Sequence, residues 1–170
     1  KLKDRQKSYL ALTPTLYCLS FSLSLFLSSV IHADNLREKT DRAVDRVALE
    51  AQEQAISRLN KSLVKYRNTE DEPDLLFKLA QSYQQSAGIQ FRILYGQNAK
   101  QSESLLKRYN TTLESCVKIL NPLIDRFSDF QDRDIAYFIR AKSYEELKKP
   151  VLARADYAKL VEAYPNSERA

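Results

Sequence analysis

The sequence is poor in the residues that most small catalytic and metal sites need. Its 170 residues include two glycines, two cysteines and one histidine, and neither methionine nor tryptophan. Glycine makes up about 7% of an average protein, so this chain lacks the residues for phosphate-binding loops, dinucleotide-binding turns and tight β-hairpins. It is rich instead in leucine, alanine, glutamate, lysine, arginine and glutamine, which favour helices. These absences predict an all-α protein.

The N-terminal segment has the pattern of an export signal. Residues 1–7 hold four basic residues and one acidic residue, and the 23 residues at 9–31 carry no charge. Ala33 then supplies the small residue that a signal peptidase requires. We predict that residues 1–33 are a signal peptide and that the protein is periplasmic or otherwise located in the cell envelope. The alternative is an uncleaved inner-membrane anchor with a periplasmic domain, because this segment is long enough to cross a bilayer.

Removal of this segment would restrict the chemistry of the mature chain. His32 and Cys18 would leave with it, so that no histidine and one cysteine, Cys116, would remain. One cysteine forms no internal disulfide, and zinc, haem and triad sites that depend on histidine are excluded. Cys116 stands on an apolar helical stripe between Leu113 and Leu120, which predicts a buried thiol. We therefore predict no catalytic residue, no cofactor and no metal site.

The distribution of charge predicts a protein partner rather than nucleic acid. The net charge of +5 comes mostly from the first seven residues, and residues 34–170 carry an excess of only two positive charges. A nucleic-acid-binding domain normally shows a strong basic patch. We expect a protein or peptide partner, with membrane contact only through the N-terminal segment if it is retained.

Apolar residues recur every three or four positions along the rest of the chain, as in amphipathic helices. The stripe over 36–66 is rich in alanine and predicts a long helix, followed by a linker, within residues 34–70. This helix would pack on the domain behind it or form a coiled coil that makes oligomers. Further helical stripes follow over 73–130, where we expect a break at Gly96 and a kink or break at Pro122.

The last segment, residues 134–167, has large and small residues at fixed offsets. Its first helix carries Tyr137, Ala141 and Tyr144, and its second carries Ala153, Tyr157, Leu160 and Pro165. This pattern resembles the tetratricopeptide repeat, in which two antiparallel helices interlock. Arg140 departs from it, because the repeat has leucine there.

A second, incomplete match lies upstream. Leu76, Leu79, Ala80 and Tyr83 resemble a first helix of the same repeat, but Arg92 and Gly96 stand where its second helix should have alanine and tyrosine. We interpret residues 73–130 as a divergent hairpin with an insertion of roughly two to three helical turns around 94–105.

The resemblance implies an all-α, solenoid-like array of helical hairpins behind a long amphipathic helix, similar to exported repeat proteins of the bacterial cell envelope. It implies a non-catalytic scaffold that holds a partner peptide or helix in a groove lined by first helices. The positions that would face this groove are Phe77, Gln81, Gln84, Ile135, Phe138, Lys142 and Glu145. Two alternatives are an oligomeric assembly protein that uses a coiled coil over 36–66, and the regulatory arm of a longer enzyme continuing past residue 170.

Overall fold

The described part of the chain is helical. A computed structural model describes residues 40–41, 43–95 and 99–170. In these ranges the main helices span residues 43–65, α3 (Glu72–Tyr95), α4 (Ala99–Arg126), α5 (Arg133–Glu146) and α6 (Pro150–Ala163), and no strand occurs. The prediction of an all-α fold is confirmed. None of the described helices is long and apolar enough to span a bilayer, and the predicted signal peptide and Gly96 lie outside the described residues.

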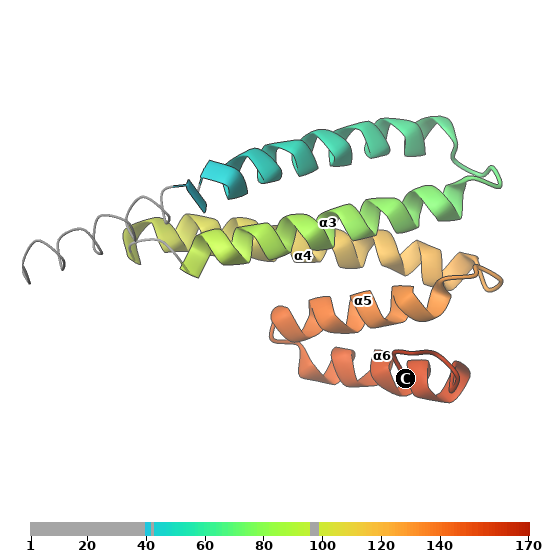
Figure 1. The fold of residues 1–170 in the computed structure, drawn as a ribbon. Helices are drawn as coiled ribbons and strands as arrows, with labels where there is room; N and C mark the ends of the chain where they lie inside the picture. The colour runs from blue at the N-terminus through green and yellow to red at the C-terminus, as the bar shows by residue number, and fades with distance from the viewer. Residues whose placement is uncertain (1–39, 42, 96–98) are drawn as a thin grey trace, which may run out of the picture. The chain divides into compact units, whose positions relative to one another are not determined.

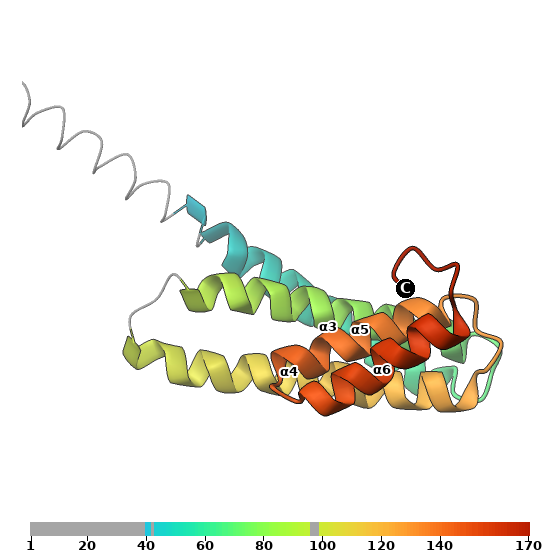
Figure 2. The same ribbon diagram turned by 90° about the horizontal axis from the view of Figure 1, so that it is seen from below.

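The helices of the compact unit at residues 44–170 run alternately up and down (Figures 1 and 2). α3 packs along α4, and α5 packs along α6. The second hairpin contacts the first mainly between α4 and α5, with a smaller contact between α3 and α5. The unit therefore contains two stacked helical hairpins, preceded by the helix at residues 43–65.

The helix at residues 43–65 lies against α3. Leu49 packs with Ile89 and Ile93 of α3, and the Asp45 carboxylate is 2.7 Å from the Arg92 guanidinium. Exposed valines are nevertheless present on this helix, at positions 44, 47 and 64. Association of copies through this helix stays a prediction.

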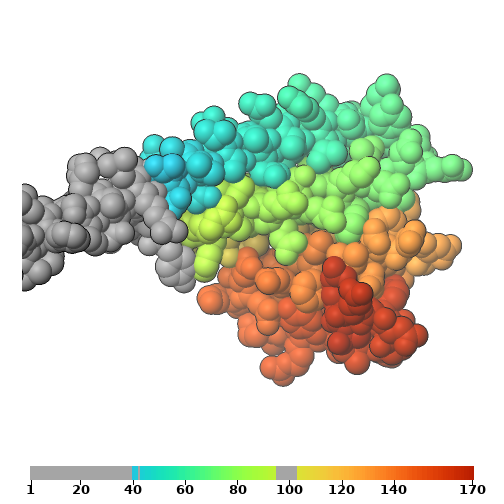
Figure 3. Space-filling view, viewed as in Figure 1, coloured from blue at the N-terminus to red at the C-terminus, as the bar shows by residue number. Residues whose placement is uncertain are grey.

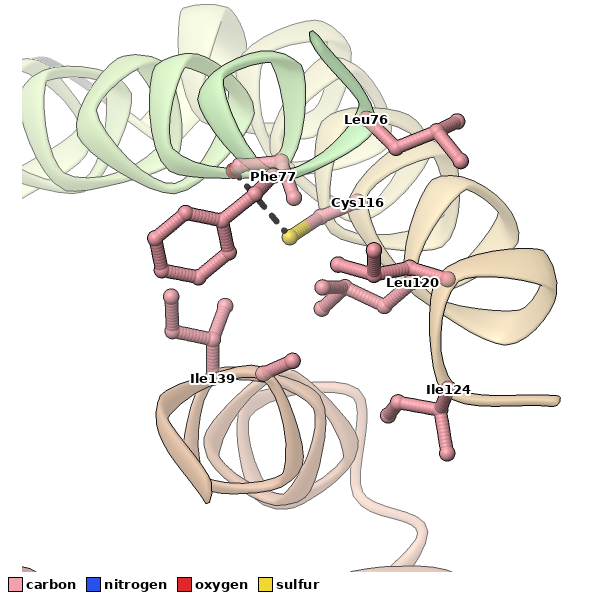
Figure 4. Packing of buried hydrophobic residues seen from close by; sticks show 9 residues of the cluster. Leu76, Phe77, Cys116, Leu120, Ile124 and Ile139 are labelled. Carbon is pink, nitrogen blue, oxygen red and sulfur yellow. Dashed lines mark hydrogen bonds between the residues drawn. The ribbon is translucent and has the colours of Figure 1, made fainter. Parts of the chain in front are cut away.

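The main core lies where α3, α4 and α5 meet. Figure 4 shows its side chains pointing toward one another from the three helices: Leu76 and Phe77 from α3, Cys116, Leu120 and Ile124 from α4, and Ile139 from α5. Two alanines of this cluster, Ala80 and Ala136, are fully buried. Because a methyl group occupies little space, the helix backbones approach closely at these points.

Cys116 belongs to this core. Its side chain is fully buried, and its thiol donates a hydrogen bond to the carbonyl oxygen of Ala80, with a sulfur–oxygen distance of 3.4 Å. Burial raises the pKa of the thiol to about 12. Because the thiolate is the nucleophilic form, the folded protein keeps Cys116 unreactive at neutral pH, and the prediction of a buried thiol is confirmed.

Pro122 neither ends nor breaks α4, which continues to Arg126. Proline removes one backbone donor from the helix. The last turn is held by its surroundings instead, because Leu123 and Ile124 are buried in the core and Arg126 is paired. The break expected as one alternative at this proline is therefore wrong, since tertiary packing overrides the local preference, whereas the other alternative, a kink, stays a prediction.

An ion pair closes the end of the unit where α3 begins and α4 ends. The Glu72 carboxylate accepts two hydrogen bonds from the Arg126 guanidinium, at 2.8 and 2.9 Å, and a third from the backbone N–H of Asn68 at 2.8 Å. Glu72 is buried, whereas the Arg126 side chain is half exposed. The hydrogen bonds from Arg126 hold the pKa of Glu72 below its ordinary value of 4.5.

A second ion pair ties α6 to α5 and α4. The Arg140 guanidinium donates to both carboxylate oxygens of Asp156, at 2.7 and 2.8 Å, and to the side-chain oxygen of Asn121 at 3.0 Å. The Arg140 and Asp156 side chains are 13% and 8% exposed. Arg140 therefore fills the place of the repeat's leucine with a charge that is paired with Asp156 and hydrogen-bonded to Asn121.

The Glu72 pair predicts a dependence of stability on pH. A carboxyl whose pKa is lowered by folding contributes stability above its unfolded pKa, and this contribution is lost as pH falls through the folded value. We expect Glu72→Gln to unfold at a lower temperature than the wild type at pH 7, with the difference shrinking below pH 4.5. Thermal melts followed by circular dichroism between pH 3 and pH 7 measure it. The control is Glu70→Gln at a neighbouring exposed position; if both variants give the same pH profile, the pair contributes nothing.

The Arg140 pair predicts an asymmetric mutant cycle. Asp156→Ala leaves a buried guanidinium without its carboxylate, which should lower the free energy of unfolding by about 3 kcal/mol. Adding Arg140→Leu removes the unpaired charge and restores the repeat's residue, so the double variant should be more stable than Asp156→Ala alone. Urea denaturation measures the free energy of unfolding of the wild type, of Asp156→Ala and of the double variant. Lys159→Ala, which breaks an exposed pair with Glu162 on the same helix, should cost less than about 0.5 kcal/mol; an equal cost for Asp156→Ala would contradict the expectation.

Candidate partner-binding groove

The two hairpins differ in length. α3 and α4 have 24 and 28 residues, whereas α5 and α6 have 14 each. Figures 1 and 2 show the consequence, because α3 and α4 extend past the end of the α5–α6 hairpin on the side of the turn between α5 and α6. One end of the longer hairpin is therefore not covered by the shorter one.

A sharp cap ends α5 at this point. Lys148 has a φ of 59°, the left-handed conformation that commonly ends a helix. Its N–H donates to the carbonyl of Glu145, and the N–H of Lys149 donates to the carbonyl of Tyr144, which together form a Schellman motif. Pro150 then begins α6 at a position where its missing N–H costs nothing. The turn is thus fixed by local chemistry.

The capped end of α5 and the uncovered part of α3 and α4 enclose an open groove of about 970 Å³, which we call the overhang groove. Its floor is apolar and consists of Phe91 and Leu94 from α3 and Leu106 and Tyr109 from α4. Phe91 and Leu106 are 42% and 46% exposed, so the floor of the groove presents large apolar side chains to solvent. In the space-filling view the orange and red α5–α6 hairpin lies on the side of α3 opposite the helix at residues 43–65 (Figure 3).

Acidic residues stand around this floor. Glu103 of α4 and Glu145 and Glu146 of α5 line the groove, with Lys148 as the one basic residue among its lining side chains. In the described part of the chain, no lysine or arginine forms an ion pair with any of these three glutamates. The groove therefore combines an apolar floor with an acidic rim.

Two tyrosines position the rim carboxylates of α5. The Tyr109 hydroxyl donates to Glu146 at 2.6 Å, and the Tyr157 hydroxyl donates to Glu145 at 2.9 Å. Burial, followed by this hydrogen bond and the charges of Glu145 and Glu146, raises the pKa of Tyr157 to about 12. The Tyr157 phenol is therefore neutral at neutral pH and donates its proton to the hydrogen bond with Glu145 at the edge of the groove.

The predicted groove-facing residues lie in different surroundings. Lys142 and Glu145 are exposed on α5, and Gln81 and Gln84 are half-buried on α3. Ile135 is half-buried and packs against the main core. Phe138 is half-buried too, with its ring 6.3 Å from Tyr157 and the Arg169 guanidinium 6.0 Å from its centre. Of these residues, Glu145 also lines the overhang groove.

Phe77 requires a correction. It was expected to face the groove, but it is 6% exposed and belongs to the main core. Its ring packs edge-on against Phe130 in the loop before α5, with centroids 5.3 Å apart. Phe77 does lie on the first helix of the upstream hairpin, but the loop between the two hairpins covers this part of α3. The sequence pattern does not indicate the path of that loop.

Sequence reasoning missed the overhang groove itself. Its floor joins residues 91–94 and 106–109, and its wall comes from residues 145–148, so no local motif contains it. A partial signal was present, because the insertion inferred around 94–105 lengthens the first hairpin. In the described residues no cluster of histidine, cysteine and acidic side chains has the arrangement of a metal site.

Comparison with known protein families identifies the second hairpin. A tetratricopeptide repeat model matches residues 135–167, which is the segment formed by α5, α6 and the turn that follows. Neither the curated proteins nor the solved structures give a significant match to this chain. The family indicates a role in protein–protein interaction.

The fold and the comparison agree. α5 and α6 are two antiparallel helices of equal length that pack along each other, and they carry the alanines and tyrosines that the family uses for interlocking. The hairpin α3–α4 stacks on them in the same up-and-down manner. Residues 135–167, which form α5, α6 and the turn after them, are therefore a tetratricopeptide repeat.

Proposed function

We propose that this protein is a non-catalytic scaffold of the bacterial cell envelope that binds a partner protein through its repeat-like helices. The observation that carries the proposal is the stacking of a tetratricopeptide repeat on a longer hairpin, which leaves an open groove of about 970 Å³ beside α5. An apolar floor with polar groups around it is the usual form of a binding site.

The envelope location rests on the N-terminal sequence. Four basic residues in 1–7, an uncharged stretch over 9–31 and Ala33 are the features of an exported chain. The non-catalytic role is supported by the use of the titratable groups with shifted pKa values. Glu72, Arg126 and Arg140 form ion pairs, and Tyr157 donates a hydrogen bond to Glu145. Burial raises the pKa values of Tyr144 and of the Cys116 thiol. These features suit a protein that acts by binding a partner on its surface.

Site-specific photocrosslinking in cells of the source species tests the proposal. We expect Lys142 of α5 and Gln84 of α3 to face the partner. A benzophenone amino acid at either position should give one discrete adduct in the periplasmic fraction. The control position is Lys118, which is exposed on α4 and should give none. Adducts of equal yield at all three positions, or none at any, would argue against a binding face, and recovery from the cytoplasmic fraction would argue against export.

A further inference from the structure

We propose that the overhang groove binds an amphipathic helix or extended segment of a partner protein whose apolar side chains are flanked by lysine or arginine. This proposal rests on the proposed scaffold function and adds the chemistry of the partner. It concerns a surface that the lengthened α3–α4 hairpin creates at the end of the repeat.

The floor determines the first property of the partner. Leu106 and Phe91 are nearly half exposed although their neighbours Tyr109 and Ile93 are buried. Covering such side chains removes apolar surface from water, which is the main favourable term in association. The groove is bounded on one side by Leu147, which packs against the Ala87, Tyr109 and Leu113 cluster, so an occupant would meet a fixed wall.

The rim determines the second property. Glu103, Glu145 and Glu146 line the groove together with one lysine, while residues 34–170 as a whole carry a slight excess of positive charge. The acidic character is therefore local to this groove and does not come from the general surface. An occupant whose apolar side chains rest on the floor could place its basic side chains beside these carboxylates. Such charge complementarity gives specificity.

Two helical peptides of 18 residues serve as probes, with leucine on one face and either lysine or glutamate on the other. Fluorescence anisotropy with the full 170-residue chain should show binding of the leucine–lysine peptide at least tenfold tighter than that of the leucine–glutamate peptide. This preference should decrease as salt is raised, because exposed charges are screened.

Matched variants locate the binding. Leu106→Gln should weaken the leucine–lysine peptide at least fivefold, whereas Leu152→Gln, at an equally exposed leucine of α6, should not. The pair Glu103→Gln and Glu145→Gln should reduce the preference for lysine at least fivefold, in contrast to Glu50→Gln with Glu114→Gln at exposed positions elsewhere. Circular dichroism verifies that each variant keeps its helix content, and Leu106→Ala provides a milder substitution.

Three results would overturn the proposal. Unchanged binding in both Leu106 variants would place the peptide elsewhere, and an equal loss of preference in the two glutamate pairs would assign it to the general surface. A dimer in sedimentation velocity that Leu106→Gln dissociates would identify a second copy of this chain as the occupant. If the peptides fail while photocrosslinking at Lys142 and Gln84 still captures a partner, the scaffold function stands and only the partner chemistry is wrong.

Discussion

The close approach of α3, α4 and α5 is the constraint on which the rest of the unit depends. Ala80 and Ala136 are fully buried in the shared core, and the sulfur of Cys116 on α4 reaches the backbone carbonyl of Ala80 on α3. A longer side chain at these contacts would push the helices apart. The small residues therefore help to set the register, that is, which turns of α3, α4 and α5 face one another.

The overhang groove follows from that register. Because α5 is aligned with the first half of α3 and ends at the cap around Lys148, the additional turns of α3 and α4 emerge beyond it. The two ends of the unit are then held by different polar contacts: Glu72 with Arg126 where α3 begins, and Tyr109 with Glu146 beside the groove. The first closes an end of the core, whereas the second fixes a carboxylate at the edge of an open surface.

The sequence predicted what local spacing determines, and it failed where distant segments meet. The helices, the pairing of α5 with α6 and the burial of Cys116 follow from three- and four-residue periodicity and from alanine and tyrosine offsets. The burial of Phe77 under Phe130 and the continuation of α4 through Pro122 depend on packing partners far away in the chain. Arg140 appeared only as a departure from the repeat, because its partners come from two other helices: Asp156 of α6 balances its charge, and Asn121 of α4 accepts a hydrogen bond from it.

The position of the rim acids also bears on function. Glu145 and Glu146 occupy the last turn of α5, which contains no basic residue, and the negative end of the helix dipole disfavours carboxylates there by about 0.3–1 kcal/mol each. Lys148 and Lys149 follow this last helical turn, and their positive charges offset part of the unfavourable interaction with the dipole. In the core the same chain pairs its buried charges, as Arg140 and Asp156 do, but at the groove it leaves glutamates beside apolar side chains. Residues that lower the stability of a helix are expected mainly at functional surfaces. Here Glu145 and Glu146 supply the negative charge that a basic partner segment requires.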